Sequence, residues 1–463
     1  MHRTQCTALI TSALGPYLKD EMLKDIGTSP YSLLIDESTD IEVKKLLCIC
    51  VKYFSIKHKK FVSTFLGMLE LNQPSAEDIA NAVLSLLESC NLETENVIGI
   101  GTDGASVMSG KHHSAFTLWR DKQPSLQLVR CICHSLDIIA KKAIRSIPSH
   151  AEFMIRETYK WFAHSPKRQA DYRELYLTLD GGMPLKLISP CETQWLVMAD
   201  CVERLLEQYD ALSLHFSTES YVEHCYAARM LQEMYHDETN LLYLTFLKPI
   251  LQDIKVVNKI FQLESGDALH IFRYLYTLYV PTLKRILKPS VSTSNHQEHL
   301  QSLDLQSSAI YLSQEDVDLG LAFRKKLEES KLTSVSKDGI VKRCLEFLKV
   351  LACEYQFHLP ESLSMLKKLE VLSPQKVLAD CKPPVTDLPH AFFTYPLEVL
   401  ESQWRIISSC SFPETSNMES FWMEVYNYTH AAGKHCFHKP AMGPIKMLTL
   451  PYPVLMLKGY FPK

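Results

Sequence analysis

The sequence predicts an α/β protein in which a mixed sheet comes first and a large all-helical region follows. Two observations lead to this prediction. Residues 1–150 alternate short runs rich in Val, Ile, Phe, Tyr and Cys with amphipathic helical patterns. From about Ala151 to about Tyr355 the apolar residues recur mostly with helical spacing. We therefore expect a sheet-containing core over residues 1–150, a helical domain with linkers over 151–390, and a C-terminal helical return over 391–463.

Five runs have the composition of β-strands, because β-branched and aromatic residues fit a pleated, half-buried surface. The first three are separated by charged or polar turns and predict an antiparallel meander. The fourth and fifth follow helical patterns, and a strand reached through a crossover helix lies parallel to a neighbour. The predicted strands are residues 32–36, 46–54, 61–71, 97–101 and 126–132.

Helical patterns separate the later strands and fill the region after them. A helix opens at Pro74-Ser75-Ala76-Glu77 and runs to about Cys90. Two segments rich in Ser, Gln, His or Pro, residues 289–308 and 373–389, read as loops or linkers. The other predicted helices are residues 105–120, 134–145, 202–214, 241–263, 271–287 and 340–355.

Charge and cysteine usage limit the class of protein. The net charge of -4 and the isoelectric point near 6.5 provide no overall attraction to nucleic acid, so any DNA binding would be local. Short basic clusters at 57–60, 141–145 and 167–168 could provide it, or could simply be solvated. Fourteen cysteines without a repeating framework, and no long uncharged apolar run, favour the reducing nucleus or cytoplasm and no membrane span.

Two aspartates occupy equivalent places at the ends of predicted strands. Asp36 ends the first strand in LLIDESTD, and Asp103 ends the fourth in IGIGTDGAS, where Gly101 and Gly104 permit a sharp turn. If these strands are neighbours, both carboxylates face one crevice and could hold a hard divalent cation such as Mg²⁺. A pair of metal ions held in this way cleaves phosphodiesters. The alternative is that both aspartates are turn and cap residues.

An ordered set of motifs resembles the catalytic region of the hAT DNA transposases and of their vertebrate domesticated relatives. The resemblance covers most of the chain, and it implies a ribonuclease-H-like fold interrupted by a long helical insertion domain. It also implies DNA cleavage and joining by a metal-binding Asp, Asp, Glu triad. The motifs are LLIDESTD, IGIGTDGASVMSG, RCICHSLDIIAKKA, CETQW and SNMESFWMEV.

The resemblance assigns roles to individual residues. Asp36 matches the first family aspartate, and Asp103 matches the second, so these two are the expected catalytic and metal-binding residues. Cys131 and His134 match the Cys-x-x-His signature after the fifth strand. A zinc site at Cys131, Cys133 and His134 would need a fourth ligand, and no second pair with suitable spacing lies nearby, so we favour a packing and orienting role.

Trp195 in CETQW matches the tryptophan of the family's Arg-Trp motif, which the resemblance implies can stack on DNA bases. Gln194 stands where the family usually has arginine, so a candidate phosphate contact is lost. A purely structural role of Trp195 as a core anchor is an equal alternative.

The third acid of the triad has no counterpart in this sequence. In the family, a run resembling residues 445–453 leads into a helix with the catalytic Glu and then a dimerisation segment. Glu419 and Glu424 precede that run on an amphipathic helical pattern, and we expect them to face solvent. No Cys/His finger precedes Asp36. We therefore expect a chain truncated at both ends relative to the family, with an incomplete dimerisation segment.

Two functions follow as hypotheses. The first is a degenerate or domesticated transposase-derived protein that is catalytically inactive, binds protein partners, and binds DNA weakly. The second is a Mg²⁺-dependent DNA nuclease or transposase whose third acid comes from a partner subunit or from Glu37 or Asp40. Glu37 and Asp40 can equally solvate a turn and cap the next segment.

Overall fold

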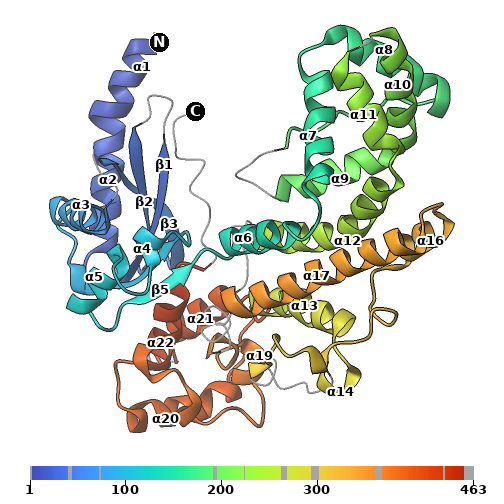
Figure 1. Cartoon of the computed structure of the whole chain (residues 1–463). Coiled ribbons are helices and arrows are strands. Elements are labelled where there is room, and N and C mark those ends of the chain that lie inside the picture. Colours follow the sequence, from blue (N-terminus) through green and yellow to red (C-terminus); the bar gives the residue numbers. More distant parts are fainter. Residues whose placement is uncertain are drawn as a thin grey trace. The chain divides into compact units, whose positions relative to one another are not determined.

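The chain divides into two compact units, each described here by itself. A computed structural model describes residues 3–39, 44–71, 75–190, 196–223, 225–261, 268–292, 302–359, 368–430 and 433–452 (Figure 1). The sheet unit comprises Met1–Ser135, Ile260–Arg273 and Glu361–Lys463. The helical unit comprises Leu136–Lys259 and Tyr274–Pro360.

One five-stranded mixed sheet forms the centre of the sheet unit, in the order β3-β2-β1-β4-β5. β1, β2 and β3 pair antiparallel, and β4 and β5 continue the sheet parallel to β1. The α/β class, the antiparallel meander and the two parallel strands are therefore confirmed. The strands are β1 Tyr31–Thr39, β2 Lys45–Ser55, β3 Lys60–Leu71, β4 Val97–Thr102 and β5 Gln127–Arg130.

The inner strands β2 and β4 are largely buried, whereas the edge strand β3 is partly exposed. Leu33, Ile35 and Val51 belong to the apolar core that also contains α3 and α5 residues such as Ile79 and Phe116. The helices before and among the strands are α1 Arg3–Leu9, a π-helical turn Ile10–Leu14, α2 Gly15–Ile26, α3 Ala76–Ser89, α4 Ser106–Ser109, α5 Ala115–Lys122 and α6 Ile132–Ile144.

The C-terminal part of the chain packs on the sheet as well. At Gly99 in β4, an added Cβ would lie 2.5 Å from the Leu450 side chain, so glycine permits the close approach of this segment. β1 and β2 contact α22. The longer C-terminal helices are α20 Leu397–Ile406, α21 Met418–Asn427 and α22 His438–Thr449, preceded by the short α19 Pro374–Val377.

The single helix predicted over residues 105–120 is wrong. Residues 106–109 form only the short α4, and Ser114 starts α5 with a capping box in which its hydroxyl accepts from the Thr117 N–H. Gly110 lies where a Cβ would come within 2.4 Å of the Ser106 carbonyl oxygen. The break therefore has a local cause, a glycine followed by an N-cap serine.

The helical unit is built around aromatic residues from several helices. Phe246 packs edge-on against Phe323 and Phe347, and a second cluster joins Trp161 to Phe216. No helix in the described ranges is long and apolar enough to cross a membrane. The helices are α7 Ser149–Ala163, α8 Pro166–Asp180, α9 Leu196–Glu207, α10 Tyr209–Val222, α11 Tyr226–His236, α12 Glu238–Phe261, α13 Ala268–Ile286, α14 Pro289–Ser292, α16 Leu321–Glu329 and α17 Ser334–His358.

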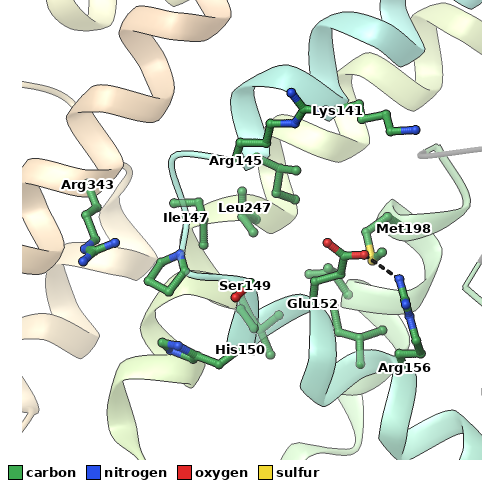
Figure 2. Close-up of a pocket in the computed structure, with 16 residues that line it drawn as sticks. Lys141, Arg145, Ile147, Ser149, His150, Glu152, Arg156, Met198, Leu247 and Arg343 are labelled. Atoms are coloured by element: carbon green, nitrogen blue, oxygen red, sulfur yellow. Dashed lines mark hydrogen bonds and ion pairs between the residues drawn. The ribbon is translucent and has the colours of Figure 1, made fainter. Parts of the chain in front are cut away.

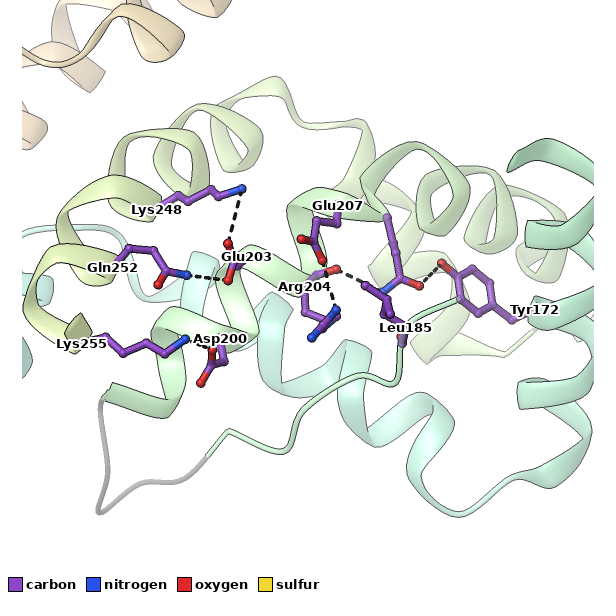
Figure 3. Close-up of polar contacts among 10 residues, drawn as sticks. Tyr172, Leu185, Asp200, Glu203, Arg204, Glu207, Lys248, Gln252 and Lys255 are labelled. Atoms are coloured by element: carbon purple, nitrogen blue, oxygen red, sulfur yellow. Dashed lines mark hydrogen bonds and ion pairs between the residues drawn. The ribbon is translucent and has the colours of Figure 1, made fainter. Parts of the chain in front are cut away.

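The single helix predicted over residues 202–214 is also wrong, because the chain breaks at Gln208 between α9 and α10. The Gln208 side chain is buried, and its amide nitrogen donates to the Leu185 carbonyl at 3.0 Å. Its amide oxygen accepts from the Tyr172 hydroxyl at 3.1 Å (Figure 3). On α9 itself, the Glu203 carboxylate accepts from the Gln252 side chain of α12 at 2.6 Å. Tertiary hydrogen bonds therefore determine where α9 ends.

We expect Gln208→Leu to destabilise the helical unit by about 1–3 kcal/mol, because the substitution leaves the buried Tyr172 hydroxyl without its acceptor. The carbonyl of Leu185, an exposed residue, also loses its donor. Urea unfolding of the whole chain, followed by circular dichroism, measures the change. Glu233→Ala, at an exposed position of α11, is the control and should change stability by less than about 0.5 kcal/mol. Equal stability of the two variants would contradict the role of Gln208.

Candidate functional site

Asp36 lies within β1, which continues to Thr39 and not to Asp36 as expected from the sequence, whereas Asp103 directly follows the neighbouring strand β4. β1 and β4 are parallel, and their last paired residues are Ile35 and Thr102. Asp36 and Asp103 each come one position later, so the topology brings them to one edge of the sheet. Both side chains are half-buried. The adjacency expected from the sequence is therefore present.

The Asp103 carboxylate takes part in the turn that follows β4. Its Oδ1 accepts a hydrogen bond from the Ala105 N–H at 3.1 Å. The Ser109 hydroxyl donates to the Asp103 carbonyl at 3.5 Å and to the Ala105 carbonyl at 3.3 Å. These contacts join the end of β4 to the short α4. Through its Oδ1, Asp103 thus stabilises the turn that follows β4.

Two buried cysteines lie near Asp36. Cys48 is its partner in the antiparallel β1–β2 ladder, and the charge of Asp36 acts on both Cys48 and Cys131. A hydrogen bond with Cys50 lowers the pKa of the Cys48 thiol, which burial and Asp36 oppose. A hydrogen bond with Cys133 likewise lowers the pKa of the Cys131 thiol. All four cysteines are buried and free of disulfides. Asp36 therefore lies near the buried thiols of Cys48 and Cys131, each of which is hydrogen-bonded to a second buried cysteine.

Cys131 fixes the start of α6 at the end of β5. Its N–H donates to the Thr102 carbonyl at 2.8 Å, and its sulfur accepts from the His134 N–H at 3.4 Å. The Cys131 carbonyl also accepts from the Ser135 hydroxyl at 3.0 Å. These contacts give Cys131 a structural role at the start of α6, in which His134 takes part through its backbone N–H; a role of the His134 side chain stays a prediction. Over the described residues, no group of three or more His, Cys, Asp or Glu side chains has the arrangement of a metal site.

Glu37, one of the two alternative acids, is held apart from Asp36. Glu37 faces the opposite side of β1, because successive side chains alternate across a strand. Its Oε1 accepts from the Lys45 ammonium at 2.6 Å. Asp40 and the DNA-stacking candidate Trp195 both lie outside the described residues.

Glu419 and Glu424 on α21 are not simply solvent-facing, contrary to the expectation from the sequence. Glu424 accepts from the Glu414 N–H at 3.1 Å. Glu419 lies 3.5 Å from the ammonium of Lys52, a buried residue in the middle of β2. The physical reason is tertiary: the apolar face of α21 packs inward, and Glu419 at its border reaches the buried cation.

Lys52 is a residue that the sequence reasoning missed. Burial lowers the pKa of Lys52, and the charge of Glu419 opposes that shift. The Lys52 ammonium also donates to the Tyr452 carbonyl at 3.3 Å. The two contacts join β2 to the C-terminal part of the chain. A lone lysine inside the apolar run LLCICVKYF was the available signal.

A known family model matches the N-terminal part of the sheet unit. The model of a family described as the ZMYM1/FAM200 RNase-like domain, DUF4371, matches residues 8–114. The matched segment contains β1 to β4 complete and includes both Asp36 and Asp103. It ends before α5, so α6, the helical unit and the C-terminal helices lie outside the match. Residues 8–114 are therefore similar to the RNase-like domain of the ZMYM1/FAM200 family.

Proposed function

We propose that this chain is a transposase-derived protein of hAT ancestry that has kept the RNase-like fold and lost DNA cleavage. It acts by binding protein partners, with weak and local DNA binding, in the nucleus or cytoplasm. The observation that carries the proposal is the local environment of Asp36 and Asp103. One oxygen of Asp103 serves a turn, and Asp36 lies beside buried thiols.

The chemistry around Asp36 argues against tight binding of a hard cation. Mg²⁺ takes oxygen ligands at near-ideal octahedral geometry and usually keeps several waters. Cys48 and Cys131 are buried, and neutral thiols are poor ligands for such an ion. A pair of metal ions about 3.5–4 Å apart needs several carboxylates to hold both ions. Two aspartates with this surrounding support a site that binds metal weakly and positions no attacking water.

The competing function, a metal-dependent DNA nuclease, needs a third acid. Glu37 is a poor source, because it is paired with Lys45 and faces the other side of β1 from Asp36. Glu419 is engaged with Lys52, and Glu424 with a backbone N–H. A carboxylate from a partner subunit is the source that this alternative would require.

The N-terminal helices support the protein-binding part of the proposal. Large apolar side chains on and around α2 are exposed, among them Tyr17 at 63% and Leu18 at 64%. Leu9, Ile10 and Leu14 are exposed by 43–52%. Monomeric soluble proteins rarely leave such a concentration of apolar surface uncovered without a binding function.

The test is calorimetric titration of Mg²⁺ and Mn²⁺ into the purified chain and into Asp36→Ala/Asp103→Ala. We expect only weak binding by the wild type, with at most a small further loss in the double variant, which should be folded by circular dichroism. Asp121→Ala/Asp338→Ala, at two exposed positions, is the matched control for the loss of two charges. Tight binding that disappears only in Asp36→Ala/Asp103→Ala would favour the metal-dependent nuclease.

A further inference from the structure

The helical unit contains a pocket of about 710 Å³ whose lining combines an apolar floor with basic side chains (Figure 2). It lies where α6 ends and α7 begins, and α9, α12 and α17 complete its walls. A volume of this size falls within the range of about 300–1,000 Å³ that is typical of small-molecule sites. The pocket is separate from the Asp36 and Asp103 edge of the sheet, which belongs to the other unit.

The floor of the pocket is built from buried aliphatic side chains. Met198 and Val202 come from α9, Leu244 and Leu247 come from α12, and Ile155 comes from α7. Each is exposed by 4% or less. Such a floor favours contact with the uncharged, flat part of a ligand, because removing apolar surface from water is favourable.

The basic side chains carry an excess of positive charge. Lys141 extends from α6, Arg145 from the turn directly after it, and Arg343 from α17 (Figure 2). None of these three has a hydrogen bond or ion pair from its side chain to any residue within the described ranges. The fourth cation, Arg156, is neutralised by Glu152 of the same helix at 2.7 Å. Three uncompensated cations therefore line the pocket.

The start of α7 adds two further features. α7 is a 15-residue helix whose N-cap residue, Pro148, provides no side-chain hydrogen bond to the first turn. The positive end of the helix dipole therefore lies at the pocket. His150 lines the pocket, and its buried Nε2 has no hydrogen-bond partner among the described residues. Buried polar atoms are nearly always hydrogen-bonded, so an orphan atom in a pocket wall indicates a missing partner.

We propose that this pocket binds a nucleoside triphosphate. The three uncompensated cations match the charge of a triphosphate, and the aliphatic floor provides the surface on which a base can lie. His150 Nε2 supplies a polar contact beside that floor. Inorganic phosphate would leave the floor uncovered, and an uncharged ligand would leave the cations unpaired. The inference is independent of the proposed loss of DNA cleavage, because it involves none of the same residues.

The test is calorimetric titration of ATP, inorganic triphosphate and adenosine into the full chain and into Arg145→Gln/Arg343→Gln. We expect ATP to bind more tightly than either fragment, and the double variant to weaken ATP binding roughly 100-fold, as for two lost charge-assisted contacts. Arg173→Gln/Arg229→Gln removes two exposed arginines elsewhere in the helical unit and should leave ATP binding unchanged.

Three outcomes would overturn the proposal. The first is no measurable ATP binding by the folded wild-type chain. The second is ATP binding that the two double variants weaken equally. The third is inorganic triphosphate binding as tightly as ATP, which would identify a general anion patch. His150→Phe provides an independent readout, because it leaves the three cations in place and should still weaken ATP binding relative to triphosphate.

Discussion

Replacing Trp422 with alanine is expected to lower the free energy of unfolding of the sheet unit by about 3–5 kcal/mol. Trp422 on α21 is completely buried. Its indole N–H donates to the Leu372 carbonyl at 2.9 Å, and its ring stacks on Trp404 with centroids 6.5 Å apart. The substitution removes a large apolar side chain and leaves a carbonyl without its donor. Both losses act at the point where three separate C-terminal segments meet.

Urea unfolding of the full chain, followed by near-ultraviolet circular dichroism, measures this change. Trp422→Phe is the matched variant, because it keeps an aromatic ring but loses the N–H to Leu372, and it should cost about 1–2 kcal/mol. A decrease of less than about 1 kcal/mol in the free energy of unfolding for Trp422→Ala would contradict the packing described for α21, because removing a buried tryptophan side chain costs more than that.

Acidification is expected to destabilise the helical unit through His215. This side chain is 2% exposed, and its Nε2 accepts a hydrogen bond from the Trp161 indole N–H at 3.2 Å. Burial lowers the pKa of His215 from 6.5 to about 4. The unfolded chain therefore binds the proton more readily than the folded chain between these two values. Stability is fully present above pH 6.5 and is lost as the pH falls toward 4.

The free energy of unfolding is expected to fall by about 2 kcal/mol at pH 5. The decrease reaches about 3 kcal/mol when His215 is fully protonated in the folded state. Urea midpoints of the full chain at pH 7.5, 6 and 5 measure it. His215→Gln keeps an acceptor for the Trp161 N–H and cannot take up a proton, so its stability should depend much less on pH. Equal pH dependence of the wild type and His215→Gln would rule out His215 as the cause.

The strands were predictable because their signals are local. Runs such as residues 46–54 are rich in β-branched and aromatic residues, and β2 is buried almost along its whole length. The adjacency of Asp36 and Asp103 followed from similar reasoning, since each aspartate comes one position after the last residue that pairs between the parallel neighbours β1 and β4. The sequence was thus sufficient for the sheet and for the location of the candidate site at its edge.

The surroundings of the site depend on contacts between distant residues, which no local pattern contains. Cys48 lies opposite Asp36 only because of the β1–β2 register. Cys131, directly after β5, is near Asp36 only because β5 joins the same sheet. The helix break at Gln208 could not be predicted, because glutamine is an ordinary helix former and its hydrogen-bond partners lie on other segments. The basic pocket joins residues of α6 and α17 that are about two hundred positions apart.

The N-terminal helices α1 and α2 were not predicted, and the reason is again physical. Most of their residues are exposed, including Tyr17 and Leu18, so apolar positions do not follow the buried face of a helix. Pattern reasoning assumes that apolar side chains face a core. It fails where apolar side chains remain on the surface, which is also where a binding partner would contact them.

A nicking assay on labelled duplex DNA tests the loss of DNA cleavage most directly. The wild-type chain and Asp36→Ala/Asp103→Ala would be incubated with DNA in Mg²⁺ and in Mn²⁺, with a chelator control. We predict that the two proteins give the same background of nicked product in both metals. Metal-dependent nicking by the wild type that is abolished in the double variant would contradict the proposal and identify an active nuclease.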